Sequence, residues 1–284
     1  MLIESYPNTF ARVGALYAGG LPELPEVETI ARALSRCLPG RRIRRVHFLS
    51  ERAPAGCPHE IASRLRARRI TRVGRRGKFL LLELDDGDVL AIHLGMTGSL
   101  RWRGAPGPHT RAVFDLDDGR LLFDDPRQFG RIELSNNPPA RVARLGPEAL
   151  EISAHEFERR LHQRRGRMKA LLLDQCFLAG LGNIYADEAL FRARIHPLTR
   201  PSKLSADRIR RLHRAIRDLL REAIAAGGSS VSDYVDADGR PGFFQFAHRV
   251  YRRTGLPCAN CGARIRRIVV AGRGTHYCPR CQRP

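Results

Sequence analysis

The sequence predicts an α+β protein with a β-rich amino-terminal domain, a helical carboxyl-terminal domain and a metal-binding hairpin at its end. In the first half, apolar runs are joined by Asp85–Gly87 and Asp117–Gly119, which are turns typical of β-hairpins. In the second half, apolar residues recur at helical spacing. The composition changes at Ser135–Pro139, so we expect a linker there and the domain boundary near residue 150.

The amino-terminal domain is expected to begin with a helix over residues 25–38. Its apolar residues fall on one face, and a Pro-Gly pair follows it as a stop signal. This helix would hold the segment around Pro22 in place. Strands are expected over four apolar runs: Phe79–Leu84, Val89–His93, Ala112–Leu116 and Leu121–Phe123.

The second half contains helical patterns separated by turn residues. A pair of glycines, Gly227 and Gly228, ends the last and longest of them. The sequence shows no internal repeat. Helices are expected over four ranges: His155–Arg164, Met168–Phe177, Ile184–Arg194 and Ser205–Ala226.

The chain is strongly basic. Lys and Arg number 50 against 29 Asp and Glu, which gives a formal charge of +21 and favours a polyanionic partner. No apolar run approaches the roughly 18 residues of a membrane span, so nucleic acid is favoured over a membrane. Seven cysteines without a disulfide framework indicate a reducing compartment, and we expect a cytoplasmic protein.

Two Cys-x2-Cys pairs lie near the end of the chain, Cys258 with Cys261 and Cys278 with Cys281, and sixteen residues separate the pairs. This spacing fits one zinc ion held by four thiolates. Because four thiolates fill the coordination sphere, we expect a structural zinc ion without a reactive water. The segment between the pairs has basic residues that favour contact with DNA: Arg264, Arg266, Arg267 and Arg273.

Residues 22–29, Pro-Glu-Leu-Pro-Glu-Val-Glu-Thr, resemble the mature amino terminus of the bacterial formamidopyrimidine-DNA glycosylases. Further motifs in the family's order extend the resemblance over residues 22–284. It implies a catalytic β-sandwich with flanking helices at 22–149, a helix-two-turn-helix domain with a lesion-recognition loop at 150–246, and a zinc-finger β-hairpin at 247–284.

The resemblance also implies roles for single residues. Pro22 would attack the sugar of the damaged nucleoside, and Glu23 would handle protons. Lys78 would contact the damaged nucleotide, while Arg273 would contact the flanking phosphates and assist elimination. Met96, Arg127 and Phe129 would fill the gap left by an extruded base, with Arg127 reading the opposite cytosine. The remaining DNA contacts would come from His109, Arg127, Arg164, Arg165, Lys169 and Asn183.

The implied function is base-excision repair. Such an enzyme removes 8-oxoguanine and formamidopyrimidines from duplex DNA and nicks the abasic site by β,δ-elimination through a Schiff base. It would act as a monomer on the bacterial nucleoid, with one zinc ion as its cofactor. Two alternatives stay open. One is the sister group for oxidised pyrimidines, which typically has glycine where this chain has Leu24. The other is a non-catalytic zinc-ribbon DNA-binding protein.

The position of Pro22 inside the chain sets a chemical condition. A proline nitrogen in a peptide bond is an amide whose lone pair is delocalised, so the chain with residues 1–21 attached should be inactive. A free amino-terminal nitrogen has a pKa of roughly 8 and can attack a sugar carbon. We therefore expect residues 1–21 to be absent from the mature protein, with Leu21 marking the true start. Removal by proteolysis, or an extension retained on a non-catalytic protein, are the alternatives.

Overall fold

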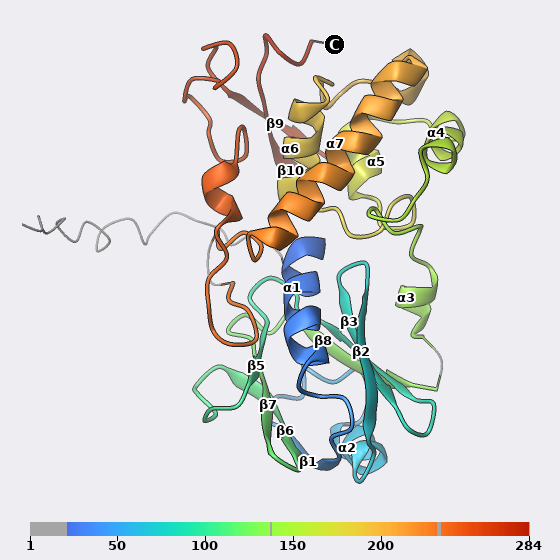
Figure 1. Cartoon of the computed structure of the whole chain (residues 1–284), viewed down its shortest axis with the longest axis vertical. Coiled ribbons are helices and arrows are strands. Elements are labelled where there is room, and N and C mark those ends of the chain that lie inside the picture. Colours follow the sequence, from blue (N-terminus) through green and yellow to red (C-terminus); the bar gives the residue numbers. More distant parts are fainter. Residues whose placement is uncertain (1–21, 137, 232–233, 284) are drawn as a thin grey trace, which may run out of the picture.

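The computed structural model describes residues 22–136, 138–231 and 234–283. The prediction for residues 1–21 lies outside the described residues. Figure 1 shows β-sheets in the lower half, helices and a β-hairpin in the upper half, and helix α1 (Leu24–Ser35) between them. The predicted α+β class is confirmed, and α1 matches the first expected helix.

The lower half is a sandwich of two antiparallel four-stranded sheets, in the orders β1-β6-β7-β5 and β2-β3-β4-β8. Apolar side chains from both sheets and from α1 form one core between them, including Leu82, Ile92, Phe114 and Ile30. Helix α2 (Pro58–Leu65) packs against β1. The strands are β1 (Ile43–Phe48), β2 (Ile70–Arg76), β3 (Phe79–Leu84), β4 (Val89–His93), β5 (Ser99–Trp102), β6 (Thr110–Leu116), β7 (Gly119–Asp124) and β8 (Arg131–Ser135).

The expected strands correspond to β3, β4, β6 and β7, whereas β1, β2, β5 and β8 were not predicted. For β1 and β2 the reason is a shift of register. In β1 the shift lies between Ile43 and Arg45, and in β2 it follows Ile70. Each shift places consecutive buried residues three positions apart, as in Ile43 and Val46. An extra residue in a strand breaks the alternation by which strands are recognised in a sequence.

The upper half contains the helices that were expected, with one correction. Helix α5 ends at Leu173 rather than Phe177, because Asp174 leaves the helical conformation and its carboxylate accepts the Cys176 N–H at 2.9 Å. Side chains from α4 to α7 form a second core. The helical segments here are α3 (Ala140–Ala143), α4 (Ala154–His162), α5 (Met168–Leu173), α6 (Asn183–Arg192), η1 (Pro201–Lys203), α7 (Ala206–Ala225) and η2 (Phe244–Ala247).

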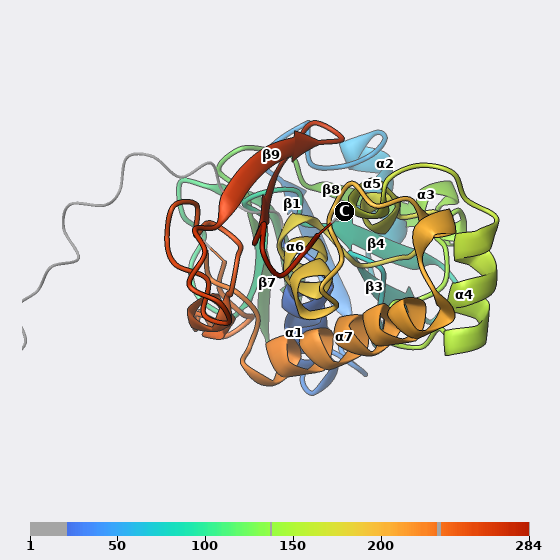
Figure 2. The ribbon, with the colours of Figure 1, turned by 90° about the horizontal axis from the view of Figure 1, so that it is seen from above.

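Helix α1 joins the two halves, since Leu24 packs in the upper core and Val27 in the lower one. The segment after α7 also spans both, because Tyr234 and Ala237 are buried in the lower core. In Figure 2, α6 lies between α7 and the hairpin of β9 (Arg266–Val270) and β10 (Arg273–Tyr277). Among the described residues, no helix combines the length and apolar character needed to cross a membrane.

Candidate active site and DNA interface

The start of α1 is docked against the start of α6. Glu23, which is buried, accepts the N–H groups of Gly182 at 2.7 Å, Ile184 at 2.8 Å and Tyr185 at 3.3 Å. The first turn of a helix offers unpaired N–H groups and a positive dipole end, so a carboxylate is stabilised there. Burial nevertheless raises the pKa of Glu23, against the opposing effects of the Lys78 charge and these donors. A raised pKa suits a group that must both give and take a proton.

Two glycines make this docking possible. A side chain at Gly182 would overlap the Glu23 carboxyl group, and one at Gly180 would overlap Leu24. Gly180 also has a φ of +105°, which only glycine adopts without strain. The backbone N–H of Leu24 donates to Gly180 O at 3.1 Å. The glycine turn thus holds the buried residue Pro22 and its neighbour Glu23 against the helical half.

A second buried carboxylate, Glu26, shapes the turn from within α1. It accepts the Tyr185 hydroxyl at 2.6 Å, the Ser229 N–H at 2.7 Å and the Glu23 N–H at 2.8 Å. The pKa of Glu26 is raised to about 7, chiefly by burial; the Tyr185 hydrogen bond opposes this rise and the Glu23 charge adds to it. Glu26 therefore connects α1, α6 and the segment after α7 at one point.

Lys78 and Arg273 approach this turn from opposite parts of the chain. Lys78 lies in the turn between β2 and β3 and is partly buried. Loss of water lowers the pKa of its ammonium group, while the charges of Glu23 and Glu26 raise it and that of Arg273 lowers it. Lys78 therefore lies within the electrostatic reach of Glu23, Glu26 and Arg273, although Arg273 belongs to the exposed end of the terminal hairpin. The fold brings together the predicted catalytic set of Pro22, Glu23, Lys78 and Arg273.

Lys169 lies in a different environment from the one predicted. Its side chain is fully buried and forms an ion pair with Asp187, and its ammonium group donates to Asn183 Oδ1 at 2.8 Å. Asp187 also accepts the His276 N–H at 2.9 Å, and Asn183 donates to Gly274 O at 3.0 Å. In this arrangement Lys169 has no surface for a phosphate. It holds Asn183 and Asp187, which in turn contact strand β10.

Two loops carry the predicted wedge and are tied to each other. Met96 follows β4, whereas Arg127 and Phe129 lie between β7 and β8. Thr97 donates to Asp125 at 2.6 Å, and the Arg127 N–H donates to Thr97 at 3.2 Å. Phe129 is 52% exposed, and the Arg127 guanidinium lies 5.0 Å from its ring centre. An exposed ring on a braced loop is available for stacking on bases.

The other predicted DNA contacts are exposed. His109 lies beside the wedge, since its carbonyl accepts the Asp125 N–H at 2.9 Å. Arg164 and Arg165 lie in the connection between α4 and α5. The structure places them where they are accessible, and their contacts with DNA stay predictions.

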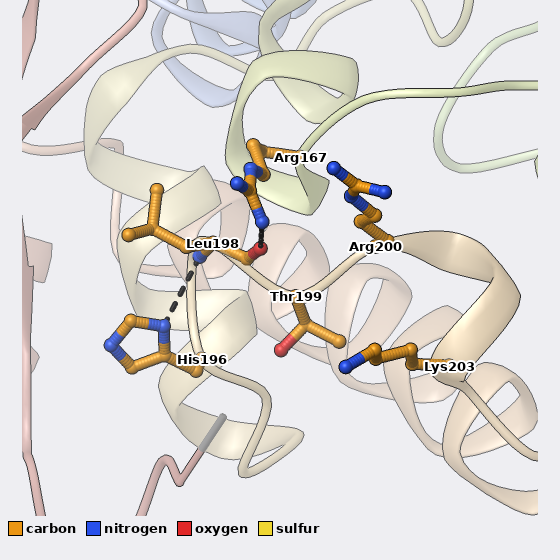
Figure 3. Close-up of a pocket in the computed structure, with 6 residues that line it drawn as sticks. All are labelled: Arg167, His196, Leu198, Thr199, Arg200 and Lys203. Atoms are coloured by element: carbon orange, nitrogen blue, oxygen red, sulfur yellow. Dashed lines mark hydrogen bonds between the residues drawn. The ribbon is translucent and has the colours of Figure 1, made fainter.

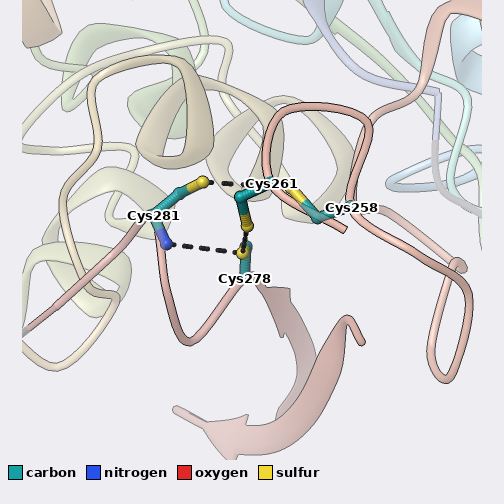
Figure 4. Close-up of side chains that lie close together, drawn as sticks. All are labelled: Cys258, Cys261, Cys278 and Cys281. Carbon is teal, nitrogen blue, oxygen red and sulfur yellow. Dashed lines mark hydrogen bonds between the residues drawn. The ribbon is translucent and has the colours of Figure 1, made fainter. Parts of the chain in front are cut away.

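The four cysteines of the terminal hairpin converge (Figure 4), with all four sulfur atoms within 4.8 Å of one another. Cys258 Sγ lies 3.9 Å from Cys281 Sγ, and Cys261 Sγ lies 3.4 Å from Cys278 Sγ. Tetrahedral zinc with Zn–S bonds of about 2.3 Å requires sulfur atoms about 3.8 Å apart. The thiol set therefore fits the predicted structural zinc ion.

Sequence reasoning assigned no individual role to Tyr185 or His248, and it placed Ser229 only within the expected lesion-recognition loop. Ser229 Oγ lies 3.3 Å from the Tyr185 hydroxyl and 3.1 Å from His248 Nε2, so the three extend the contacts of Glu26. Burial lowers the pKa of His248 to about 4, which keeps it neutral near pH 7. Ser229 is separated in the sequence from Tyr185 by 44 residues and from His248 by 19 residues, so no local pattern predicts these contacts. The one available signal was that Tyr185 belongs to the glycine-rich motif before α6.

Comparison with known proteins agrees with this geometry. Three family models match: "Formamidopyrimidine-DNA glycosylase N-terminal domain" over residues 21–132, "Formamidopyrimidine-DNA glycosylase H2TH domain" over 145–235, and "Zinc finger found in FPG and IleRS" over 255–284. The last match and the clustered thiols together identify the structural zinc site.

Individual relatives align over nearly their whole length. The formamidopyrimidine-DNA glycosylase of Solibacter usitatus is 54% identical and covers 93% of this chain and 100% of its own. The crystal structure of the MutM (FPG) protein from Thermus thermophilus has a TM-score of 0.84 at 47% identity, covering 92% and 98%. Lactococcus lactis Fpg in complex with abasic-site DNA has a TM-score of 0.86 at 36% identity, covering 93% and 100%. The chain belongs to the formamidopyrimidine-DNA glycosylase family.

Proposed function

We propose that the chain is a bifunctional DNA glycosylase and abasic-site lyase that acts on oxidised purines in duplex DNA. The observation that carries this function is the turn at Pro22 and Glu23, which is held against the start of α6 and lies within the electrostatic reach of Lys78. A nucleophile, a buried acid–base group and a cation for phosphate are the parts that such a reaction needs.

The reaction begins when the free secondary amine of Pro22 attacks C1′ of the extruded nucleotide and the base leaves with a proton. Glu23 gives a proton to O4′ as the C1′–O4′ bond breaks, so the sugar ring opens and an iminium forms between Pro22 and C1′. The iminium acidifies C2′, so loss of a C2′ proton breaks the C3′–O bond, and loss of a C4′ proton in a second elimination breaks the C5′–O bond. Lys78 and Arg273 balance the negative charge of the phosphates that flank the reacting sugar.

Two of the related solved structures support the choice of substrate. They are a Lactococcus lactis Fpg mutant in complex with DNA that contains Fapy-dG, and Lactococcus lactis Fpg in complex with DNA that contains an abasic site. By family resemblance, 8-oxoguanine opposite cytosine is a further substrate. The charge of +21 supports salt-dependent searching along DNA, and with it an association with the nucleoid.

We also propose that the enzyme is active only when Pro22 is the first residue, because its nitrogen must be an amine. The test is borohydride trapping on a duplex with 8-oxoguanine opposite cytosine, for the chain beginning at Met1 and for the chain beginning at Pro22. Covalent product is expected from the shorter chain alone. Product from both would contradict the requirement for a free proline nitrogen.

The matched control is Pro22→Gly in the shorter chain. Trapping should weaken while binding of damaged duplex stays near that of the parent, since the change removes the secondary amine but no phosphate contact. Undiminished trapping by this variant would refute the nucleophile assignment. Tight DNA binding without product from any of the three proteins would support the non-catalytic DNA-binding alternative.

A further inference from the structure

Two adjoining cavities lie on the helical half, outside the site described above. Their volumes are about 420 Å³ and about 620 Å³, and both are lined by Arg167 and Arg200. They lie between the connection that precedes α5 and the connection that follows α6. Figure 3 shows Arg167, Arg200 and Lys203 arranged around Thr199 in the smaller cavity.

The cavities are rich in cations and have no carboxylate among their described lining residues. Arg167 donates to Leu198 O at 2.9 Å. Within the described part of the chain, the side chains of the other four cations have neither a hydrogen bond nor an ion pair. These four are Arg164, Arg165, Arg200 and Lys203. This surface therefore carries positive charge that no carboxylate among the described lining residues balances, and it attracts anions.

Backbone hydrogen bonds hold Thr199 in the wall of the smaller cavity, and its side chain contains an unsatisfied polar atom. The Thr199 carbonyl accepts the Met168 N–H at 2.9 Å, and the Thr199 N–H donates to His196 O at 2.9 Å. Thr199 is only 5% exposed, yet its hydroxyl has no partner among the described residues. Buried hydroxyl groups are normally hydrogen-bonded, so this one indicates an oxygen-bearing ligand or water at the cavity wall.

The cavities adjoin the predicted DNA interface. The Lys169 N–H donates to Pro197 O at 3.1 Å, and its ammonium group donates to Asn183 Oδ1 at 2.8 Å. Lys169 thus links the segment that contains the cavity residues His196 and Leu198 to a predicted phosphate contact. Arg164 and Arg165, which resemblance assigns to DNA, line the larger cavity. The basic surface is therefore continuous with the predicted DNA contacts Arg164 and Arg165.

We propose that Arg167, Thr199, Arg200 and Lys203 form a second phosphate site, which takes backbone phosphates of the same duplex outside the nucleotides that flank the lesion. This inference rests on the proposed function and extends its footprint on DNA. The site adds affinity and search capacity without contacting the reacting sugar. Free phosphates offer the same chemistry, so the experiment must separate the two sources.

The test uses Arg200→Gln combined with Lys203→Gln in the zinc-loaded chain that begins at Pro22. Both side chains are exposed, so folding should be unaffected. Affinity is measured against salt concentration on a long duplex and on one trimmed to the lesion-flanking base pairs. Each phosphate contact contributes about 0.9 to the slope of log affinity against log salt, so the variant should lose about 1 to 2 on the long duplex. On the trimmed duplex it should match the parent.

The control is Arg214→Gln combined with Arg221→Gln, which removes the same charge from α7. That helix lies on the opposite side of α6 from the terminal hairpin in Figure 2. A long-duplex slope equal to that of the parent, or an equal loss in the control, would overturn the proposal. Inorganic tripolyphosphate distinguishes the second source. If the parent binds it, the Arg200→Gln and Lys203→Gln variant does not, and the DNA salt slope of that variant is unchanged, the proposal is overturned in favour of a free polyphosphate.

Single-turnover base excision on the trimmed duplex is measured alongside. Absence of excision by the parent chain would count against the proposed glycosylase activity, whereas the salt slopes would still report on the phosphate site. The failure of one proposal can therefore be distinguished from the failure of the other.

Discussion

Substitution of Glu26 by glutamine should change how the stability of the protein depends on pH. Glu26 is 1% exposed, and burial raises its pKa from 4.5 to about 7. The folded protein therefore binds a proton that the unfolded chain has already released between these pH values. Stability from this group is fully present below pH 4.5 and is lost as pH rises through 7.

The size of the effect follows from the two pKa values. One pKa unit corresponds to about 1.4 kcal/mol, so ionised Glu26 costs about 3 kcal/mol above pH 7 relative to its protonated form. Glutamine has no such titration. It keeps an acceptor for Tyr185 and Ser229, but its amide group cannot accept the Glu23 N–H, and that loss costs about 1 kcal/mol at every pH.

The assay is urea unfolding of the zinc-loaded chain at several pH values from 4.5 to 8. The free energy of unfolding of Glu26→Gln, relative to the parent, should rise by about 3 kcal/mol across this range. Glu51→Gln is the matched control, because Glu51 is exposed and undergoes the same chemical change. Parallel pH profiles for the parent and Glu26→Gln would refute the reasoning that burial raises the pKa of Glu26.

Three further outcomes are expected. Cys258→Ser should release zinc and weaken DNA binding as well as catalysis, and an unchanged zinc content with normal affinity would argue against the finger. Phe129→Ala should slow base extrusion, followed with a fluorescent base analogue beside the lesion; an unaltered extrusion rate would remove Phe129 from the wedge. Asp187→Asn leaves the buried Lys169 charge without its carboxylate, so the free energy of unfolding should fall by about 3 to 5 kcal/mol in urea titration. An unchanged unfolding midpoint would contradict this.

Prediction from the sequence worked best where the signal is local. The strands β3 and β4 and the long helix α7 follow from apolar spacing and turn residues alone. The prediction for helix α5 was too long because apolar residues continue past Asp174. The carboxylate of Asp174 favours a turn instead. Strands β1 and β2 were missed because register shifts disturb their alternation.

Among the site residues, the four cysteines are predictable because their spacing is set by one metal ion. The environment of Lys169 was not predictable. Its motif suggested a phosphate contact, whereas its partner Asp187 lies 18 residues away and removes the charge from the surface. A motif identifies which residue is used, but the packing around it decides what that residue can contact.

The sequence by itself determined the α+β class, the zinc ligands, the basic character of the protein and the chemical condition on Pro22, because each depends on residue type, local spacing or covalent bonding. Only the tertiary structure decided that the carboxylate of Glu23 is held by the first turn of α6, at a separation of 159 residues from Gly182. It also decided that Glu26 meets Tyr185, and that Arg200 and Lys203 line a cavity with Thr199 without a side-chain partner among the described residues. Burial and long-range hydrogen bonds set these environments, and no local pattern in the chain encodes them.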